Sequence, residues 1–374
     1  MKKIFVLISL FIFTSFNLIS AEEIPNDPVE EITHFGVVSE IVSEEKIIDE
    51  VTNQEMYIQV LKVKIDNAKD DLIEVNNGDQ FDIRNTRYKK GDNVIIKGFK
   101  DITGNVTYRI SETNRSGPLL FIALAFSVLA IIIARKKGIY SLLSLVFSFI
   151  IIFTILLPML VSGKDPLVSV ILSSLILLPV IFYLSHGFNT KTTIAIIATL
   201  SCMILTGILA NIFIDLTNLQ GYTSDESYLL KNQIANFDMR NLLLAGMIIS
   251  SLGILDDITV SQISIVFELH ALNPDLKIRD LYSKGMNVGK DHIASMINTL
   301  VLVYAGSSLP LLLLFINNPL PAAELISFEM LATEIVKTLV GSIGLILAVP
   351  AATMLASYYL TKMAHKKVRI EEIY

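Results

Sequence analysis

Residues 118–134 read PLLFIALAFSVLAIIIA, an uninterrupted apolar run that ends at the basic cluster Arg135-Lys136-Lys137. A helix of this composition suits the hydrocarbon core of a bilayer, which is about 30 Å thick. Similar runs recur along the chain, which is 52% hydrophobic and 18% charged, with a mean hydropathy of +0.60. Because soluble domains average about 45–50% apolar residues, these values predict an integral membrane protein.

Hydropathy predicts about seven transmembrane helices, and the positions of Lys and Arg predict their direction. The expected spans are residues 118–134, 139–161, 166–184, 193–214, 241–255, 293–316 and 339–360. Basic clusters occupy alternate connections, so we expect the N-terminal region outside the cell and the tail, residues 364–374, in the cytoplasm. Residues 321–337 carry Glu324 and Glu329 and are expected to form an interfacial helix.

The N-terminal part of the chain predicts an exported β-domain. Residues 1–21 are typical of a signal peptide, with Lys2 and Lys3 before an apolar run, although an uncleaved anchor is the alternative. Residues 56–65, MYIQVLKVKI, alternate with the period of a half-buried strand. Further strands are expected at 35–42, 71–75, 80–84, 93–99 and 106–111. Such short strands within residues 22–115 predict a small OB-like β-barrel, with an open sandwich as the alternative.

Several classes of function are disfavoured by composition and motifs. The net charge of −6 argues against a nucleic-acid partner. Cys202 is the single cysteine, so one chain can form neither a disulfide nor a thiolate metal site. Phosphate loops, zinc-binding histidine pairs and nucleophile elbows are missing. We therefore expect no cofactor, no metal and no enzymatic activity. The enzymatic alternative, an intramembrane aspartyl protease using Asp257 and Asp291, lacks its characteristic motifs.

Polar side chains enter the predicted membrane region between residues 241 and 270. The apolar stretch 241–255 gives only about 22 Å of helix, so Asp256 and Asp257 are expected at the inner membrane boundary or inside it. If the helix continues, small and polar residues share an arc of roughly 80°. These residues are Gly246, Ser250, Gly253, Asp257, Ser261, Ser264 and Glu268. The stripe predicts either a cavity or ion path, or a seam of small residues for helix packing.

The same region carries a family resemblance. The strings GMIISSLGILDDITVSQISIVFE at 246–268, GMNVGKDHIAS at 285–295 and NTLVLVYAG at 298–306 resemble the YibE/F-like family of bacterial membrane proteins. The resemblance spans the membrane domain, residues 116–363, and implies a multi-pass plasma-membrane protein without implying a reaction. The matching polar positions are our candidates for an ion path or binding site. They are Asp256, Asp257, Ser261, Gln262, Glu268, Lys290, Asp291, His292 and Asn298.

The favoured interpretation is a secondary transporter or permease-like protein for a small solute or ion. The alternative is a non-catalytic membrane scaffold or sensor whose outer barrel binds a ligand. The expected partners are the lipid bilayer and either a small solute or another membrane protein. His292 beside Asp291 has a side chain suited to proton transfer near neutral pH. The competing interpretation places both residues at the membrane surface, where Asp291 complements a helix dipole.

Overall fold

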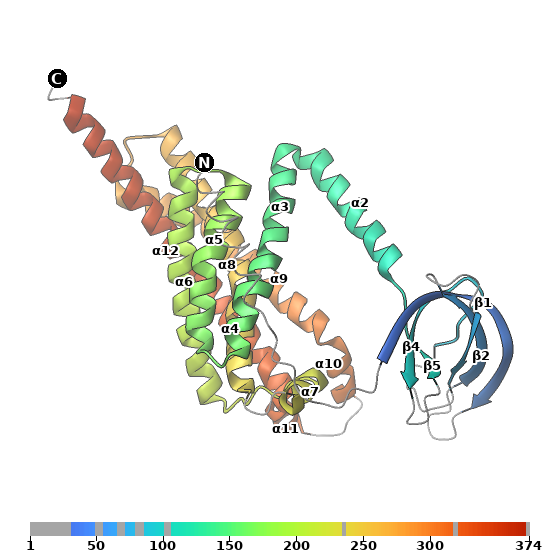
Figure 1. Cartoon of the computed structure of the whole chain (residues 1–374). Coiled ribbons are helices and arrows are strands. Elements are labelled where there is room, and N and C mark those ends of the chain that lie inside the picture. The colour runs from blue at the N-terminus through green and yellow to red at the C-terminus, as the bar shows by residue number, and fades with distance from the viewer. Residues whose placement is uncertain are drawn as a thin grey trace. The chain divides into compact units, whose positions relative to one another are not determined.

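The computed structural model describes residues 31–48, 55–65, 72–78, 86–100, 106–233, 237–316 and 321–371. The chain divides into two compact units, residues 1–132 and 133–374, which are described separately (Figure 1). The predicted signal peptide at residues 1–21 and the predicted strand at 80–84 lie outside the described residues.

The first unit contains a closed five-stranded β-barrel, which confirms the predicted barrel. The strands are β1 (Glu31–Ile48), β2 (Glu55–Ile65), β3 (Leu72–Asn77), β4 (Asn93–Lys100) and β5 (Val106–Thr113). Their order around the barrel is β1-β2-β3-β5-β4, and only β3 and β5 pair in parallel (Figure 1). Closure removes the unpaired strand edges that would invite aggregation.

The barrel has an apolar core, and the side-chain amide of Gln59 is also buried. The core side chains are Val38, Leu61, Val63, Val75, Tyr88, Val94 and Ile96. Gln59 is fully buried, donates to the carbonyl of Tyr88 at 2.9 Å and accepts from the Tyr88 amide at 2.8 Å. The turn after Tyr88 uses Gly91 at a φ of 96°, which favours glycine. The side-chain amide of Gln59 therefore joins β2 to the segment before β4 by hydrogen bonds.

Most of the described residues after the barrel are helical (Figure 1). The helices are α2 (Ser116–Ala134), α3 (Lys136–Ile151), the π-helical η2 (Ile152–Leu156), α4 (Leu157–Val161), α5 (Pro166–His186), α6 (Thr190–Leu216), α7 (Asp225–Gln233), α8 (Met239–Leu272), α9 (Ile278–Ser307), α10 (Leu309–Ile316), α11 (Ala322–Ser327) and α12 (Glu329–Glu371). Within the described residues, six helical stretches are long and apolar enough to cross a membrane: α2, α3 to α4, α5, α6, α8 and α12 up to Lys362.

The predicted sixth span, residues 293–316, is divided between α9 and α10, and α9 is not among those six. A Cβ at Gly285 would lie 2.9 Å from Thr353, whereas the Tyr304 hydroxyl is 3.9 Å from a Cβ built at Gly341. Residue numbers therefore increase along α9 in the direction in which they decrease along α12. Thus α9 runs antiparallel to α12 along the bundle. It is not among the six apolar stretches because its Lys and Asp side chains lower its mean hydropathy.

The last helix differs from the prediction at its beginning. The expected interfacial helix at 321–337 is split at Phe328, and Glu329 opens α12. The Glu329 carboxylate accepts hydrogen bonds from the amides of Gln220, Gly221 and Tyr222 at 2.8, 2.6 and 3.2 Å. Further along α12, Ala348, Ala352 and Ala356 are fully buried, as a close-packing seam requires.

Candidate functional site

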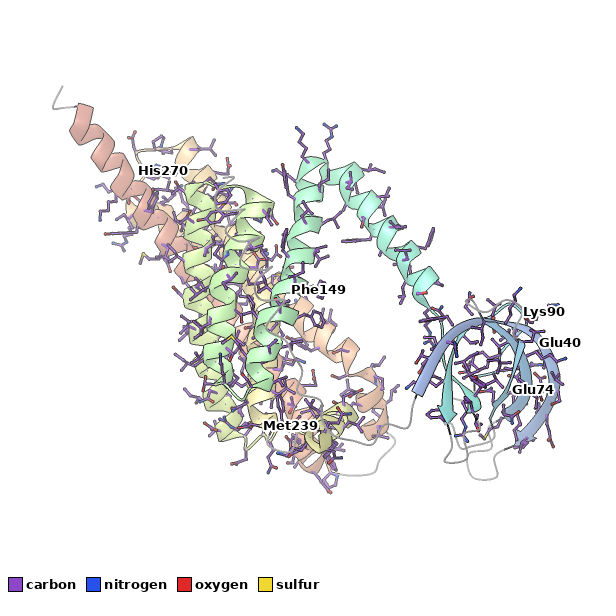
Figure 2. All side chains as sticks on the ribbon, in the orientation of Figure 1. Glu40, Glu74, Lys90, Phe149, Met239 and His270 are labelled. Carbon is purple, nitrogen blue, oxygen red and sulfur yellow. The ribbon has the colours of Figure 1, made fainter. Side chains whose placement is uncertain are left out.

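The helix that carries most of the candidate residues is continuous. The Asp238 side chain caps α8 by accepting from the Asn241 amide at 3.1 Å. The helix then runs without a break through 34 residues, from Met239 at one end of the bundle to the turn containing His270 at the other (Figure 2). At 1.5 Å per residue its length is about 51 Å, more than a bilayer core requires. We refer to these as the Met239 end and the His270 end.

Contacts with α6 fix the depth of Asp257. The hydroxyl oxygens of Thr199 and Thr259 lie 2.6 Å apart. A Cβ at Gly207 would lie 3.2 Å from the Ile248 side chain, so α6 and α8 are antiparallel. Asp257 therefore lies about 16 Å along the helix axis from the α6 N-terminus and about 22 Å from its C-terminus. Asp256 and Asp257 lie well within the length of the bundle rather than at its edge.

The small and polar stripe of α8 points away from the bundle. Gly246, Gly253, Asp257 and Glu268 are exposed, and the three serines of the stripe are partly exposed. Nothing lies within 4 Å of a Cβ built at Gly246 or Gly253. The stripe thus makes neither a packing seam nor an enclosed cavity with the described helices. It presents a carboxylate at membrane depth on the outer surface of this unit.

The two adjacent aspartates differ in environment, as expected from their rotation of about 100° around the helix. Asp256 is half-buried, whereas Asp257 is exposed. Neither carboxylate accepts a hydrogen bond from any residue in the part of the chain that the structure describes. Both are therefore available to a cation, a proton, water or another molecule. Ser261, one turn from Asp257, is partly exposed.

A second polar face lies on α9. Lys290, Asp291 and Asn298 are exposed, and His292 is half-buried. Six outward residues recur at helical spacing within an arc of about 80°, and Lys290 lies about 60° beyond one edge of that arc. The six are Asp280, Lys284, Asn287, Asp291, Ser295 and Asn298. Among the described residues none of these charged side chains forms an ion pair. The structure therefore places Asp291 and Asn298 on an outward face, as it does Asp257, whereas Lys290 and His292 lie beside that face.

Gln262 is separate from these outward candidates. Its side chain is fully buried and donates to the Gly285 carbonyl at 2.9 Å and to the Thr353 hydroxyl at 2.8 Å. Its Oε1 is buried with no hydrogen-bond partner in the described chain. A Cβ at Gly289 would lie 3.0 Å from that oxygen. Gln262 therefore joins α8, α9 and α12, and two glycines allow α9 to approach it.

Sequence reasoning missed the partners of Gln262 and the contact between Thr199 and Thr259. Gly285 and Gly289 were visible in the family string as glycines four residues apart, the spacing that lets helices approach closely. Thr353 carried no comparable signal, because a threonine in an apolar helix usually bonds its own backbone, as Thr353 also does with Val349 at 2.6 Å. Within the described residues, no group of three His, Cys, Asp or Glu side chains is placed to hold a metal.

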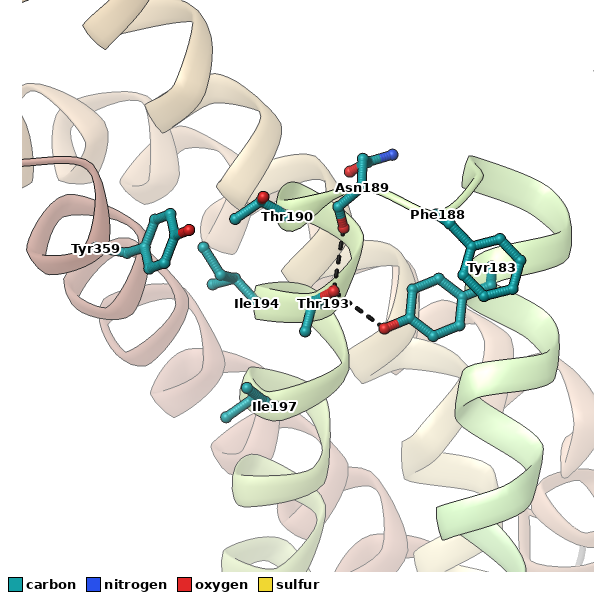
Figure 3. Close-up of a pocket in the computed structure, with 8 residues that line it drawn as sticks. All are labelled: Tyr183, Phe188, Asn189, Thr190, Thr193, Ile194, Ile197 and Tyr359. Carbon is teal, nitrogen blue, oxygen red and sulfur yellow. Dashed lines mark hydrogen bonds between the residues drawn. The ribbon is translucent and has the colours of Figure 1, made fainter. Parts of the chain in front are cut away.

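A separate hollow lies at the His270 end, between α5, α6 and α12. Tyr183 and Phe188 stack at 4.3 Å between ring centroids, and the Tyr183 hydroxyl lies 3.0 Å from the Thr193 hydroxyl (Figure 3). Tyr359 and Ile197 complete its lining, and its volume is about 430 Å³. None of the candidate residues reaches this hollow, which is open and largely apolar.

The fold and these polar helix faces define a multi-pass helical membrane protein with a β-barrel domain ahead of its spans. Comparison with protein families gives one match, YibE/F-like protein, over residues 122–362. That match covers more than half of the chain, which therefore belongs to the YibE/F-like family. No curated protein and no solved structure matches the chain.

Proposed function

We propose that this protein is a permease-like secondary transporter for a small solute or ion, whose polar path follows the outward faces of α8 and α9. The observation that carries the proposal is Asp257, an exposed carboxylate at membrane depth with no partner in the described chain. A carboxylate facing hydrocarbon is penalised by about 2.5–3.5 kcal/mol. Such a residue is therefore expected where it meets water, a cation or a proton path.

The neighbours of Asp257 support this role. Gly253 and Ser261 lie four residues to either side of Asp257, so a small and a hydroxyl-bearing residue border the carboxylate, together with the partly exposed Ile254 and Val260 three residues away. On α9, Asn287, Asp291 and Asn298 supply further oxygens on an outward face. Asp257 is the proposed coupling group, because protonation or cation binding there would remove its charge.

We further propose that the protein lies in the bacterial plasma membrane with the barrel outside and the His270 end in the cytoplasm. More basic residues belong to the His270 end, among them Lys136, Lys137, Lys191, Lys277, Arg279 and Lys284. The opposite end has fewer, Lys164, Lys231, Arg240 and Lys337, and Arg240 forms an ion pair there with Asp215. This bias follows the positive-inside rule. Reporter fusions after Lys137 and after Ser224 test it, since only the second should be active in an exported form.

The transport proposal is tested by removing one charge at a time. Asp257→Asn keeps the size of the side chain, so the protein should insert at normal abundance. We expect it nonetheless to reproduce the phenotype of a gene deletion. Asp256→Asn is the matched control at the same depth, and should have a smaller effect because Asp256 lies off the outward stripe. Phenotype and immunoblot level are measured together. A fully functional Asp257→Asn protein would contradict the proposal.

A sensor is the second candidate function, and one observation favours it. Phe35, Val42 and Ile48 of β1 are exposed by 49%, 47% and 57%. With Ile41 and Ile47, five large apolar side chains of this one strand are exposed by 36% or more, and exposed apolar side chains that gather in one region mark a binding surface. Replacing all three with Ser should abolish function in a sensor and leave a transporter active.

A further inference from the structure

We infer that the hollow between α5, α6 and α12 binds an anionic phospholipid from the membrane leaflet at the His270 end. The hollow has a volume of about 430 Å³, which is within the range of ligand pockets. It lies apart from the outward stripe of α8, so the lipid site does not depend on the proposed transport activity.

Aromatic side chains place the hollow at the boundary between hydrocarbon and water. Tyr183 lies three residues before His186, the last residue of α5, and its ring stacks on Phe188 in the turn to α6 (Figure 3). Tyr359 of α12 lies on the other side of the hollow. Tyrosine rings prefer the headgroup level of a bilayer. The end of the hollow nearest this turn therefore lies among lipid headgroups.

The deeper part of the hollow is apolar and continues along the surface of α6. Ile197 lines the hollow and is exposed, and the exposed Ile204 and Ile208 follow it. They come 7 and 11 residues after Ile197, so each is rotated from it by only about 20°. An acyl chain can lie along this face, which a soluble anion would leave uncovered. The ligand that fits is therefore amphipathic.

Basic side chains border the headgroup end of the hollow. Lys191 directly follows Thr190, a lining residue in the first turn of α6. On α12, Lys362 lies 18 residues, or about five helical turns, after Gly344. A Cβ at Gly344 would meet the Thr206 side chain of α6, so Lys362 points to the same side of α12. Within the described residues neither lysine forms an ion pair, so both are available to a phosphate.

Acidic side chains do not offset these lysines. The sequence has no Asp or Glu at 166–214 or at 335–370, the parts of α5, α6 and α12 that surround the hollow. Glu268 points about 180° away from Thr259, the α8 residue that contacts α6. The outward acids of α9 are also remote, because α9 meets α12 at Thr353, about 120° around α12 from Tyr359. The acidic residues of this half outside the three lining helices are Glu268, Asp275, Asp280 and Asp291.

Tryptophan quenching in vesicles tests the inference on the full chain. The sequence contains no tryptophan, so a single introduced one reports alone. Ile197→Trp places the reporter in the hollow. Ile208→Trp is the matched control on the same face of α6, since the two isoleucines are exposed by 51% and 44%. Each protein is reconstituted in phosphatidylcholine vesicles that contain a small fraction of lipid with brominated acyl chains, either phosphatidylglycerol or phosphatidylcholine.

The hollow should be enriched in the anionic lipid. In the Ile197→Trp protein we expect brominated phosphatidylglycerol to quench with a relative affinity at least about fivefold above that of brominated phosphatidylcholine, the factor expected from one lysine near a negative headgroup. In the Ile208→Trp protein the two lipids should quench equally. Equal quenching by both lipids at position 197, or the same preference at position 208, would overturn the inference.

Lysine replacements separate this site from general attraction to the surface. In the Ile197→Trp background, Lys191→Gln together with Lys362→Gln should abolish the preference. Lys284→Gln removes a charge at the same end from the outward face of α9 and should leave the preference intact. An unchanged preference in the first variant, or an equal loss in the control, would overturn the site. Loss of the preference in phosphate buffer, but not in chloride of equal ionic strength, would assign the hollow to a free anion and overturn the lipid.

Discussion

The barrel and the helical unit bury polar groups in different ways. In the barrel Gln59 is fully buried and all of its amide atoms have partners, Glu44 and Tyr88. In the helical unit Gln262 is equally buried, yet its Oε1 has no partner among the described residues. The carboxylates of the two units differ in the same way. Barrel carboxylates such as Glu44 pair with cations, whereas Asp257 has none in the described chain.

The difference shows which part of the molecule is complete by itself. A satisfied polar group specifies one structure, whereas an unsatisfied buried or lipid-facing group carries a free-energy cost. The described barrel residues satisfy their buried side-chain polar atoms by hydrogen bonds within the barrel. The helical unit leaves polar groups for water, an ion or another chain, so its unpaired groups are where function is expected.

Removing the side-chain amide of Gln59, whose polar atoms all have partners, should have the largest effect on stability. Gln59→Leu leaves the amide and carbonyl of Tyr88 unpaired in a buried site, and we expect a loss of about 2–5 kcal/mol in the free energy of unfolding. Urea denaturation of residues 22–115 measures it, because the closed strands should fold alone. Gln262→Leu is the counterpart in the full chain. It should change thermal stability in detergent much less, since it also removes an unpaired oxygen. Equal losses at the two sites would contradict the contrast.

Glycines on the two faces of the helical unit should respond with opposite signs. A Cβ at Gly289 would lie 2.5 Å from the Val349 side chain, so Gly289→Ala should destabilise the protein by about 1–3 kcal/mol. Gly253→Ala meets no described atom and should be neutral or stabilising by up to about 1 kcal/mol, because alanine favours helix. Thermal retention of monodisperse protein in detergent measures both. A destabilised Gly253→Ala protein would show that the outward stripe is packed within one chain.

Sequence patterns recovered the elements whose periodicity is strong. Alternation at 56–65 gave β2, and hydropathy gave α5 and α6 almost to the residue. The stripe of α8 was recognised, but its direction was not. Spacing places Asp257 and Gly253 on one face, while only neighbouring helices decide whether that face is buried. Hydropathy began the sixth span at residue 293, whereas α9 begins at Ile278, because Lys284, Lys290 and Asp291 lower the hydropathy of the first half of this helix.

Acid should weaken the barrel modestly through its surface ion pairs. Hydrogen bonds from the Arg87 guanidinium, with a further one from Gln59, lower the pKa of Glu44 below its usual 4.5. This contribution is present above the unfolded-state pKa and is lost as pH falls through the lower folded-state pKa. The urea midpoint of residues 22–115 should therefore fall on acidification below about pH 4.5. Glu44→Gln should flatten that dependence. An unchanged slope would show that the pair contributes nothing, as many exposed pairs do.

The most direct test of the account is the reactivity of α8 toward a membrane-impermeant thiol reagent. In the Cys202→Ala background, single cysteines at Asp257, Ser261 and Ser264 are labelled in sealed vesicles whose His270 end faces the reagent. Ile204→Cys on α6 is the lipid-facing control. The account predicts rapid labelling of the three α8 positions, weakest at the deepest, and none at Ile204. Protection of all three α8 positions, with the protein inserted at normal abundance, would contradict a polar path along this face.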